Sequence, residues 1–260
     1  MTTTTPSSAA GSAGSFAASD EDLAEIRQAV VDYCEGYYRR DPEQTARAYH
    51  GECVKRKFLQ AYDAWHLVVR YPASMIDLAR NDEPPIDPTY EIFIDDVADG
   101  IASVRLYSDR WVDFLHVVKH RGHWKLFHVT FDELPPEDTT PTEEDREGIT
   151  QAALDYVEAW YTGDAERHAR AYHDECIKRI YAPNGSIELV SPAAMYDYCA
   201  AGDTVLDGAE WTIEIDDIVG SVASVRIPST LYVDYVHVAK ARGKWGLFHV
   251  TYCHQSDDRP

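Results

Sequence analysis

The chain has 260 residues, of which 45% are hydrophobic and 12% aromatic, which is enough apolar material for packed cores and too much for a disordered protein. Acidic residues number 45 against 24 basic ones, and the formal charge of −21 repels nucleic-acid phosphates and anionic lipids. The sequence lacks an apolar run of ~18–20 residues, which a membrane span needs, and a signal-peptide pattern. The five cysteines form no C-x-x-C pair, as is typical of a reducing compartment. We therefore expect a cytoplasmic protein that binds neither nucleic acid nor membranes.

Residues 1–19 are rich in Thr, Ser, Ala and Gly and predict a disordered tail. After this tail the sequence contains one unit twice. The segment DYCEGYYRRDPEQTARAYHGECVKR, from Asp32, recurs from Asp155 as DYVEAWYTGDAERHARAYHDECIKR. The segment VDFLHVVKHRGHWKLFHVTF, from Val112, recurs from Val233 as VDYVHVAKARGKWGLFHVTY. The repeat predicts two domains joined by an acidic, proline-rich linker; the expected ranges are 20–132 and 143–255 for the domains and 133–142 for the linker.

Each copy begins with the pattern of an amphipathic helix, in which apolar residues recur at spacings of three and four. Asp41 before Pro42 predicts the start of a short second helix, and Asp164 has the same place in the second copy. Residues 74–80 and 191–200 indicate a third helix. The apolar positions of the first helix are Leu23, Ile26, Val30, Tyr33 and Tyr37, and in the second copy Ile149, Ala153, Tyr156 and Trp160.

The second half of each copy has the pattern of antiparallel strands. Tyr90, Ile92 and Ile94 alternate with other residues, which is typical of a strand. Arg121-Gly122 and Arg242-Gly243 each separate two apolar runs and predict a hairpin that closes the sheet. The expected fold class is therefore α+β.

Each copy ends in a strand of the form G-x-W-x-L, which begins at Gly122 and Gly243. Helices followed by antiparallel strands with this ending resemble the nuclear-transport-factor-like cone fold. The segments VDFLH, from Val112, and YHGECVKR, from Tyr49, look like those of the group described as putative lumazine-binding proteins. The resemblance implies two tandem cone-shaped α+β barrels, each with a bent sheet around its first helix and a conical pocket. In this superfamily the pocket serves ketosteroid isomerisation, scytalone dehydration, polyketide cyclisation and epoxide hydrolysis, or binding alone.

The alternation of side chains along the terminal hairpin separates its two faces. The resemblance implies that the face with Asp113, and with Asp234 in the second copy, points into the cone. Burial there raises the pKa of a carboxyl group and suits it to proton transfer. By the same alternation we expect His128 and His249 to face the interior as acid–base partners of these aspartates. The alternative is structural, because a buried aspartate can fix the strand register and a buried histidine can belong to the core.

Aromatic residues are expected to complete the two sites. The resemblance implies that Tyr33 and Tyr156, on the first helices, can donate a hydrogen bond to a substrate carbonyl, although their spacing is also typical of core packing. Between the copies, Tyr37 is replaced by Trp160 and Trp111 by Tyr232, which changes the expected pocket volume, so we expect one cone to keep an active pocket while the other is scaffold. The expected substrate-binding residues are aromatic and surround the cones: Trp111, Tyr37 and Tyr49 in the first copy, and Tyr232, Trp160 and Tyr172 in the second.

The opposite face of the hairpin is too apolar to be left in water. The resemblance implies dimers formed through this face. We therefore expect the copies to pack as an intramolecular pseudo-dimer, either monomeric or as a homodimer of it, with His116 and His237 at the interface. This face is expected to carry Phe114, His116, Val118, Phe127, Val129 and Phe131 and their equivalents in the second copy.

Two pairs of residues have a spacing suited to zinc ligands. These pairs are His50 with Cys53, and His173 with Cys176. A third ligand does not follow either pair at a recognisable interval, so we expect no metal, and no motif indicates another cofactor.

The remaining basic motif, Lys55-Arg56 and its equivalent Lys178-Arg179, either holds an anionic substrate at the mouth of the cone or pairs with surface acids. Together, the motifs and the resemblance favour a cofactor-independent isomerase, dehydratase or cyclase that acts on a small, apolar carbonyl-containing metabolite, in bacterial secondary metabolism. The alternatives are a non-catalytic carrier or sensor that uses the same cavities, and an interaction scaffold with filled cones.

Overall fold

The computed structural model describes residues 18–61, 63–81, 83–135, 140–182 and 186–255. The tail expected over residues 1–19 lies outside the described residues, apart from Ala18 and Ser19. The expected linker is described at its two ends only. Glu133 ends the last strand of the first copy, and Thr142 caps the first helix of the second.

The two copies contain the same elements in the same order. The helices expected in each copy are confirmed. Strands β1, β2, β7 and β8 were not expected, because charged residues interrupt the apolar alternation of their sequences. The first copy contains α1 (Asp20–Tyr38), α2 (Pro42–Ala48), β1 (Tyr49–Ala61), β2 (Ala64–Arg70), α3 (Pro72–Leu78), β3 (Tyr90–Ala98), β4 (Ile101–Ser108), β5 (Trp111–His120) and β6 (His123–Glu133). The second contains α4 (Glu143–Thr162), α5 (Ala165–Arg170), β7 (Tyr172–Tyr181), β8 (Ile187–Val190), α6 (Pro192–Ala201), β9 (Glu214–Val219), β10 (Val222–Pro228), β11 (Tyr232–Ala241) and β12 (Lys244–His254).

Polar caps begin the helices of the first copy. Ser19 Oγ accepts a hydrogen bond from the backbone N–H of Asp22 at the start of α1. The Asp41 carboxylate accepts from the backbone N–H groups of Glu43 and Gln44, and Pro42 takes the first position of α2. These caps therefore fix the positions at which α1 and α2 begin.

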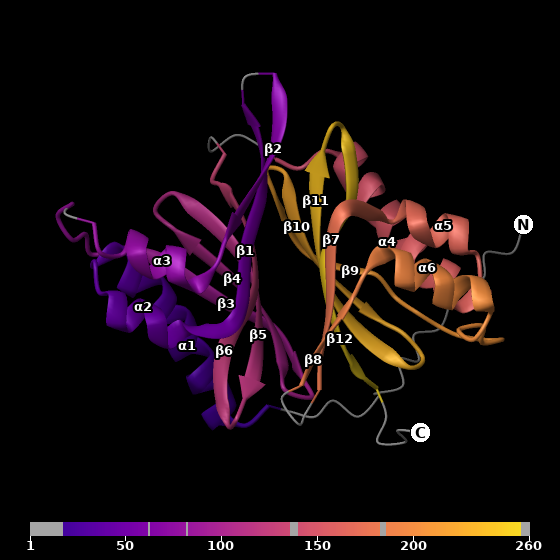
Figure 1. Cartoon of the computed structure of the whole chain (residues 1–260), viewed down its shortest axis with the longest axis horizontal. Helices are drawn as coiled ribbons and strands as arrows, with labels where there is room; N and C mark the ends of the chain where they lie inside the picture. The colour runs from indigo at the N-terminus through magenta and orange to yellow at the C-terminus, as the bar shows by residue number, and fades with distance from the viewer. Residues whose placement is uncertain (1–17, 62, 82, 136–139, 183–185, 256–260) are drawn as a thin grey trace, which may run out of the picture.

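In the described residues, each copy forms one six-stranded sheet. The strand orders are β2-β1-β6-β5-β4-β3 and β8-β7-β12-β11-β10-β9. The pairs β1–β6 and β7–β12 are parallel, and the other neighbours are antiparallel. Figure 1 shows the two sheets facing each other at the centre, with the helices of each copy on the outer side of its own sheet. This is the expected α+β architecture of two tandem cone folds.

Each sheet encloses an apolar core together with the first helix of its own copy. In the first copy, Ile26 and Val30 of α1 belong to the same buried cluster as Val104, Leu115 and Leu126 of the sheet. An equivalent cluster forms in the second copy. Full burial of each such aliphatic side chain contributes about 1.5–3 kcal/mol. The concave side of each sheet is thus the interior of a cone.

The convex faces of the two sheets pack against each other (Figure 1). Phe114 of the first copy and Phe248 of the second lie in one apolar cluster. Near them the rings of His116 and His237 stack, with their centroids 3.7 Å apart. The chain therefore forms the expected intramolecular pseudo-dimer, and His116 and His237 are interface residues as expected.

A β-bulge in β6 reverses the direction of the side chains that follow it. In the β5–β6 pairing His116 lies opposite His128, but the next residue, Val117, lies opposite Leu126. Phe127 is therefore the extra residue of the bulge. The β11–β12 pairing contains the same irregularity.

The bulge overturns the expected position of two candidate residues. His128 and His249 face the interface between the copies, where their rings stack with centroids 4.6 Å apart, and do not face the cones. Thr130 also lies at the interface, with Oγ1 hydrogen-bonded to His249 Nδ1 at 2.9 Å. Conversely, Val129 and Phe131, expected at the interface, lie on the cone side of the sheet. Simple alternation fails here because one inserted residue shifts it by one position.

Candidate functional site

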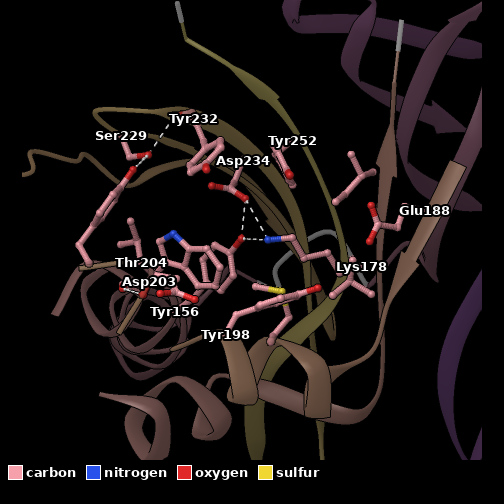
Figure 2. Close-up of a pocket in the computed structure, with 16 residues that line it drawn as sticks. Tyr156, Lys178, Glu188, Tyr198, Asp203, Thr204, Ser229, Tyr232, Asp234 and Tyr252 are labelled. Atoms are coloured by element: carbon pink, nitrogen blue, oxygen red, sulfur yellow. Dashed lines mark hydrogen bonds and ion pairs between the residues drawn. The ribbon is translucent and has the colours of Figure 1, made fainter. Parts of the chain in front are cut away.

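The second copy contains a pocket of about 340 Å³, enclosed by α4, α6 and the concave face of its sheet. This volume is in the range of small-molecule sites. Figure 2 shows Tyr156, Lys178 and Asp234 pointing toward one another in the pocket. The rest of the lining is mainly apolar and aromatic, with Val157, Trp160, Tyr161, Ile180, Val190, Met195, Tyr198, Tyr232 and Tyr252, and it also contains the polar residues Glu188, Asp203, Thr204 and Ser229.

Three buried polar groups form a chain in this pocket. Lys178 Nζ donates to Tyr156 Oη at 2.7 Å, and Tyr156 Oη donates to Asp234 Oδ1 at 2.5 Å. Lys178 Nζ lies 3.9 Å from the same Oδ1, at the limit of an ion pair. In Figure 2 these interactions converge on one oxygen of Asp234, while the other oxygen points away from them. That second oxygen is therefore available to a ligand.

Three different elements place these groups in the pocket. Tyr156 lies on the buried face of α4, and Asp234 points inward from β11. Lys178 follows Cys176 by two positions on β7, and Cys176 is a core residue of the second copy. Residues two apart on a strand share a face, so Lys178 also points into the cone.

Burial shifts the pKa values of all three groups toward their neutral forms. It raises the pKa of Asp234, while the attraction of Lys178 and the hydrogen bond from Tyr156 act to lower it. Burial also lowers the pKa of Lys178, against the attraction of Asp234. The pKa of Tyr156 is raised by burial and by the charge of Asp234, so its hydroxyl remains a donor. The carboxyl and the amine are therefore closer in proton affinity than they are in water.

Aromatic rings surround the amine. Lys178 Nζ lies 4.8 Å from the ring centroid of Tyr252, 5.1 Å from that of Tyr156 and 5.6 Å from that of Trp160. These ring faces favour a cation and so partly offset the cost of burying the charge. The pocket therefore combines a largely aromatic wall with a buried cluster of one amine, one phenol and one carboxyl group, and Glu188 and Asp203 add two further carboxyl groups to its lining.

The first copy has the same three groups in a tighter arrangement. Lys55 Nζ lies only 2.5 Å from Asp113 Oδ1 and also contacts the Tyr33 hydroxyl, which donates to Asp113 Oδ1 at 2.8 Å. The cavity beside them is only about 40 Å³. It can hold a water molecule but not a metabolite. Of the two cones, the second is therefore the one with space for a ligand.

Larger side chains fill the first pocket. Arg70 lines it, whereas Val190 occupies the equivalent place in the second copy. The two residues are equivalent because Arg70 pairs with Lys55 and Val190 pairs with Lys178 across neighbouring strands. Trp111 lines the first pocket at the position of Tyr232, which narrows it further.

Most of the expected aromatic residues lie at the pockets. Tyr37 and Trp111 line the first pocket, and Trp160 and Tyr232 line the second. Two expectations are wrong, since Tyr49 and Tyr172 are buried behind Tyr33 and Tyr156 and do not line these pockets. Their rings make edge contacts with those tyrosines, with centroids 5.8 and 5.9 Å apart respectively.

The expected pairing of aspartates with histidines is also wrong. His128 accepts a hydrogen bond at Nε2 from Arg179 Nε of the other copy at 2.7 Å, and Arg56 binds His249 in the same way at 2.7 Å. Burial lowers the pKa of both histidines, and the two arginines add to this effect. These rings are therefore neutral acceptors in the interface, separated from the cones by the sheets.

Sequence reasoning missed Lys55 and Lys178 as residues of the cones. The expectation placed the basic pairs at the mouth of the cone or on the surface, but the structure splits each pair. In the second copy Lys178 enters the pocket, whereas Arg179 enters the interface. The signal was present in the alternation Cys176, Lys178, Ile180, because the outer two residues belong to the core of the second copy.

Other chemical sites are weaker. His50 contacts His120, with Nε2 and Nδ1 3.3 Å apart, and His173 binds the carbonyl of Ala239. Among the residues that the structure describes, no three His, Cys, Asp or Glu side chains gather as a metal would require.

None of the described helices is both long and apolar enough to cross a membrane.

The chain belongs to the family described as putative lumazine-binding, which matches it twice, over residues 21–132 and 144–252. No curated protein matches the sequence. Each copy therefore corresponds to one domain of this family.

Solved structures are similar to about one copy at a time. An NTF2-like protein of unknown function from Shewanella baltica is 20% identical, with 45% of this chain and 98% of that chain covered and a TM-score of 0.41. A ketosteroid isomerase-like protein from Erwinia carotovora is 16% identical, with 44% and 99% covered and a TM-score of 0.36. A putative scytalone dehydratase from Novosphingobium aromaticivorans is 19% identical, with 42% and 83% covered and a TM-score of 0.33.

Proposed function

We propose that the pocket of the second copy binds a small, largely apolar carbonyl compound and moves a proton on the carbon next to the carbonyl. Isomerases, dehydratases and aldol cyclases share this step. The observation that carries the proposal is a buried carboxyl group, Asp234, that faces an apolar cavity beside a phenol and an amine. The proposal needs no cofactor.

Each polar group has a role in this chemistry. Burial raises the pKa of Asp234, so its carboxylate is a stronger base than that of a solvated aspartate. This carboxylate takes the proton from the carbon next to the carbonyl. Tyr156 keeps its proton and turns its hydroxyl from Asp234 to the developing enolate oxygen. Lys178, bonded to Tyr156, holds positive charge near that oxygen when it is protonated.

A non-catalytic carrier is the second candidate. The observation in its favour is that Lys178, Tyr156 and Asp234 already satisfy one another without a ligand. An apolar compound could then fill the cavity through the aromatic lining alone. A carrier requires no exchange of protons with its ligand, and this difference separates the two candidates.

The test uses acetophenone, an apolar ketone with exchangeable methyl protons. Proton NMR in D₂O measures loss of the methyl signal with the wild type, Asp234→Asn and Asp113→Asn. We expect the wild type and Asp113→Asn to accelerate the exchange, and Asp234→Asn to lose about 10²–10⁴-fold of the acceleration while still binding the ketone. Binding without exchange in the wild type would support the carrier, and equal exchange in both variants would overturn the role of Asp234.

A further inference from the structure

We propose that Lys178 Nζ is a nucleophile that forms an imine with an aldehyde or ketone held in the second pocket. The inference rests on the proposed function, because it requires a carbonyl compound in that cavity. It assigns Lys178 a covalent role in addition to that of a nearby charge.

Lys178 is buried but faces the cavity. Its side chain is 7% exposed, and it lies in the wall of the 340 Å³ pocket. The long side chain approaches from β7, so Nζ lies between Tyr156 and the rings of Trp160 and Tyr252. A flat carbonyl compound stacked on these rings would present its carbonyl carbon to Nζ.

The amine is not locked in a direct ion pair. Lys178 Nζ is 3.9 Å from the nearest oxygen of Asp234, and the Tyr156 hydroxyl bridges the two groups at 2.7 and 2.5 Å. Only an unprotonated amine has the electron pair that attacks a carbonyl. Burial lowers the pKa of Lys178 and so increases that neutral fraction, which is how desolvated lysines become nucleophiles.

The proposed step balances with the groups present. The Nζ lone pair adds to the carbonyl carbon, and the carbonyl oxygen takes a proton from Tyr156 Oη to give a carbinolamine. Tyr156 regains a proton from the nitrogen, directly or through Asp234. The carbinolamine hydroxyl leaves as water with the last proton of the nitrogen, which Asp234 relays, and the C=N bond forms. The net change is amine plus carbonyl to imine plus water.

The first copy offers an internal control. Lys55 has the same neighbours, but its Nζ lies 2.5 Å from Asp113 Oδ1, and the adjoining cavity is only about 40 Å³. Burial lowers the pKa of Lys55 as well, so the copies differ in contact and space: the Lys55 amine lies directly against the carboxylate and has no space for a ring-sized aldehyde. The difference between the copies therefore predicts selective reaction at Lys178.

The test traps the imine with benzaldehyde and sodium cyanoborohydride, followed by intact mass and peptide mapping. Lys178 is expected to gain one benzyl group faster than exposed Lys244, because its amine faces an aromatic pocket that holds the aldehyde and because burial increases its neutral fraction. Lys55→Arg should leave the labelling unchanged, and Lys178→Arg should abolish it at this site. Labelling of Lys178 no faster than that of Lys244 would overturn the proposal.

Binding of benzyl alcohol distinguishes failure of the imine from failure of the pocket, because this probe has the ring but no carbonyl. If benzyl alcohol binds the wild type and Lys178 is not labelled, the imine is wrong and the apolar pocket stands. If it does not bind, the proposed function fails as well. In the wild type, benzyl alcohol should also slow the labelling of Lys178 but not of Lys244, a result that does not depend on the folding of a variant.

Discussion

Val190 lies directly across from Lys178 in the pairing of β7 with β8, at the place that Arg70 holds across from Lys55. The aliphatic side chain leaves the space above the amine open, whereas the guanidinium of Arg70 lines and narrows the first pocket. This difference in an edge strand, together with Trp111 at the position of Tyr232, separates an open cone from a nearly filled one. The two copies have diverged at the position that controls access to the buried amine.

Replacing Val190 with arginine should close the second pocket. The new side chain would occupy the cavity and place a second cation near Lys178, so the affinity for acetophenone should fall at least about tenfold, or about 1.4 kcal/mol. Titration calorimetry measures the change. The matched control is Leu189→Arg. Leu189 is 69% exposed, so an arginine at this position adds the same charge outside the pocket. Equal loss in both variants would show that charge, and not the filled cavity, weakens binding.

Replacing Tyr156 with phenylalanine should destabilise the second copy. The change leaves the buried Lys178 and Asp234 without the hydroxyl that bridges them, and each unsatisfied buried group costs about 1–3 kcal/mol. Urea unfolding measures the free energy. Tyr196→Phe, on the exposed side of α6, is the control and should change stability by less than about 0.5 kcal/mol. If Tyr156→Phe is as stable as the wild type, the hydroxyl of Tyr156 does not stabilise the buried Lys178 and Asp234.

Replacing Arg56 with methionine should weaken the interface between the copies. Arg56 donates to His249 and to the backbone carbonyls of Glu175 and Phe248, all in the second copy. Each buried acceptor left without a donor costs about 1–3 kcal/mol. Arg80→Met serves as the comparison, since the pairing of Arg80 with Asp77 is exposed and contributes little. Similar unfolding free energies for the two variants would contradict the interface role.

Acid should destabilise the pseudo-dimer through its interface histidines. Burial lowers the pKa of His116 to about 3, and it lowers the pKa values of His128, His237 and His249 well below 6.5; the arginines of the interface add to the effect in all four. The unfolded chain therefore binds more protons below about pH 6.5, so stability is complete above this pH and falls as pH decreases toward about 3. Asp216 and Asp234 act in the opposite direction, because burial raises the pKa of Asp216 to about 6 and that of Asp234 above its usual value, but they are two groups against the four interface histidines.

The measurement is urea unfolding at several pH values between 7 and 4. The free energy of unfolding should rise with pH across this range. A flat or falling profile would show that the rings accept protons in the folded state. Replacing His116 and His237 together with phenylalanine should reduce the slope, since both rings then no longer titrate.

The sequence was informative where local patterns match the fold. The repeat predicted two domains and the alternation separated the two faces of the hairpin, and the resemblance carried by the G-x-W ending implied two cones, their packing through the convex faces and the inward direction of Asp113 and Asp234. The catalytic role of these aspartates stays a prediction.

The errors came from features that local patterns do not encode. The bulge at Phe127 shifts the alternation by one residue, so His128 moves from the expected cone to the interface. Lys178 was expected at the mouth of the cone or paired with surface acids, because a charged residue is rarely fully buried without a partner, and its partners, Tyr156 and Asp234, are distant in sequence. Only the fold brings the three together.

The most direct test of the claim that the second cone is the ligand site is saturation binding of acetophenone to the wild-type chain. The measurement gives the number of molecules bound per chain. The open second cone and the filled first cone predict one molecule per chain in the wild type, one in Asp113→Asn and none in Val190→Arg. Two equivalent sites per chain, or one site that persists in Val190→Arg, would contradict the assignment of the chemistry to the second copy.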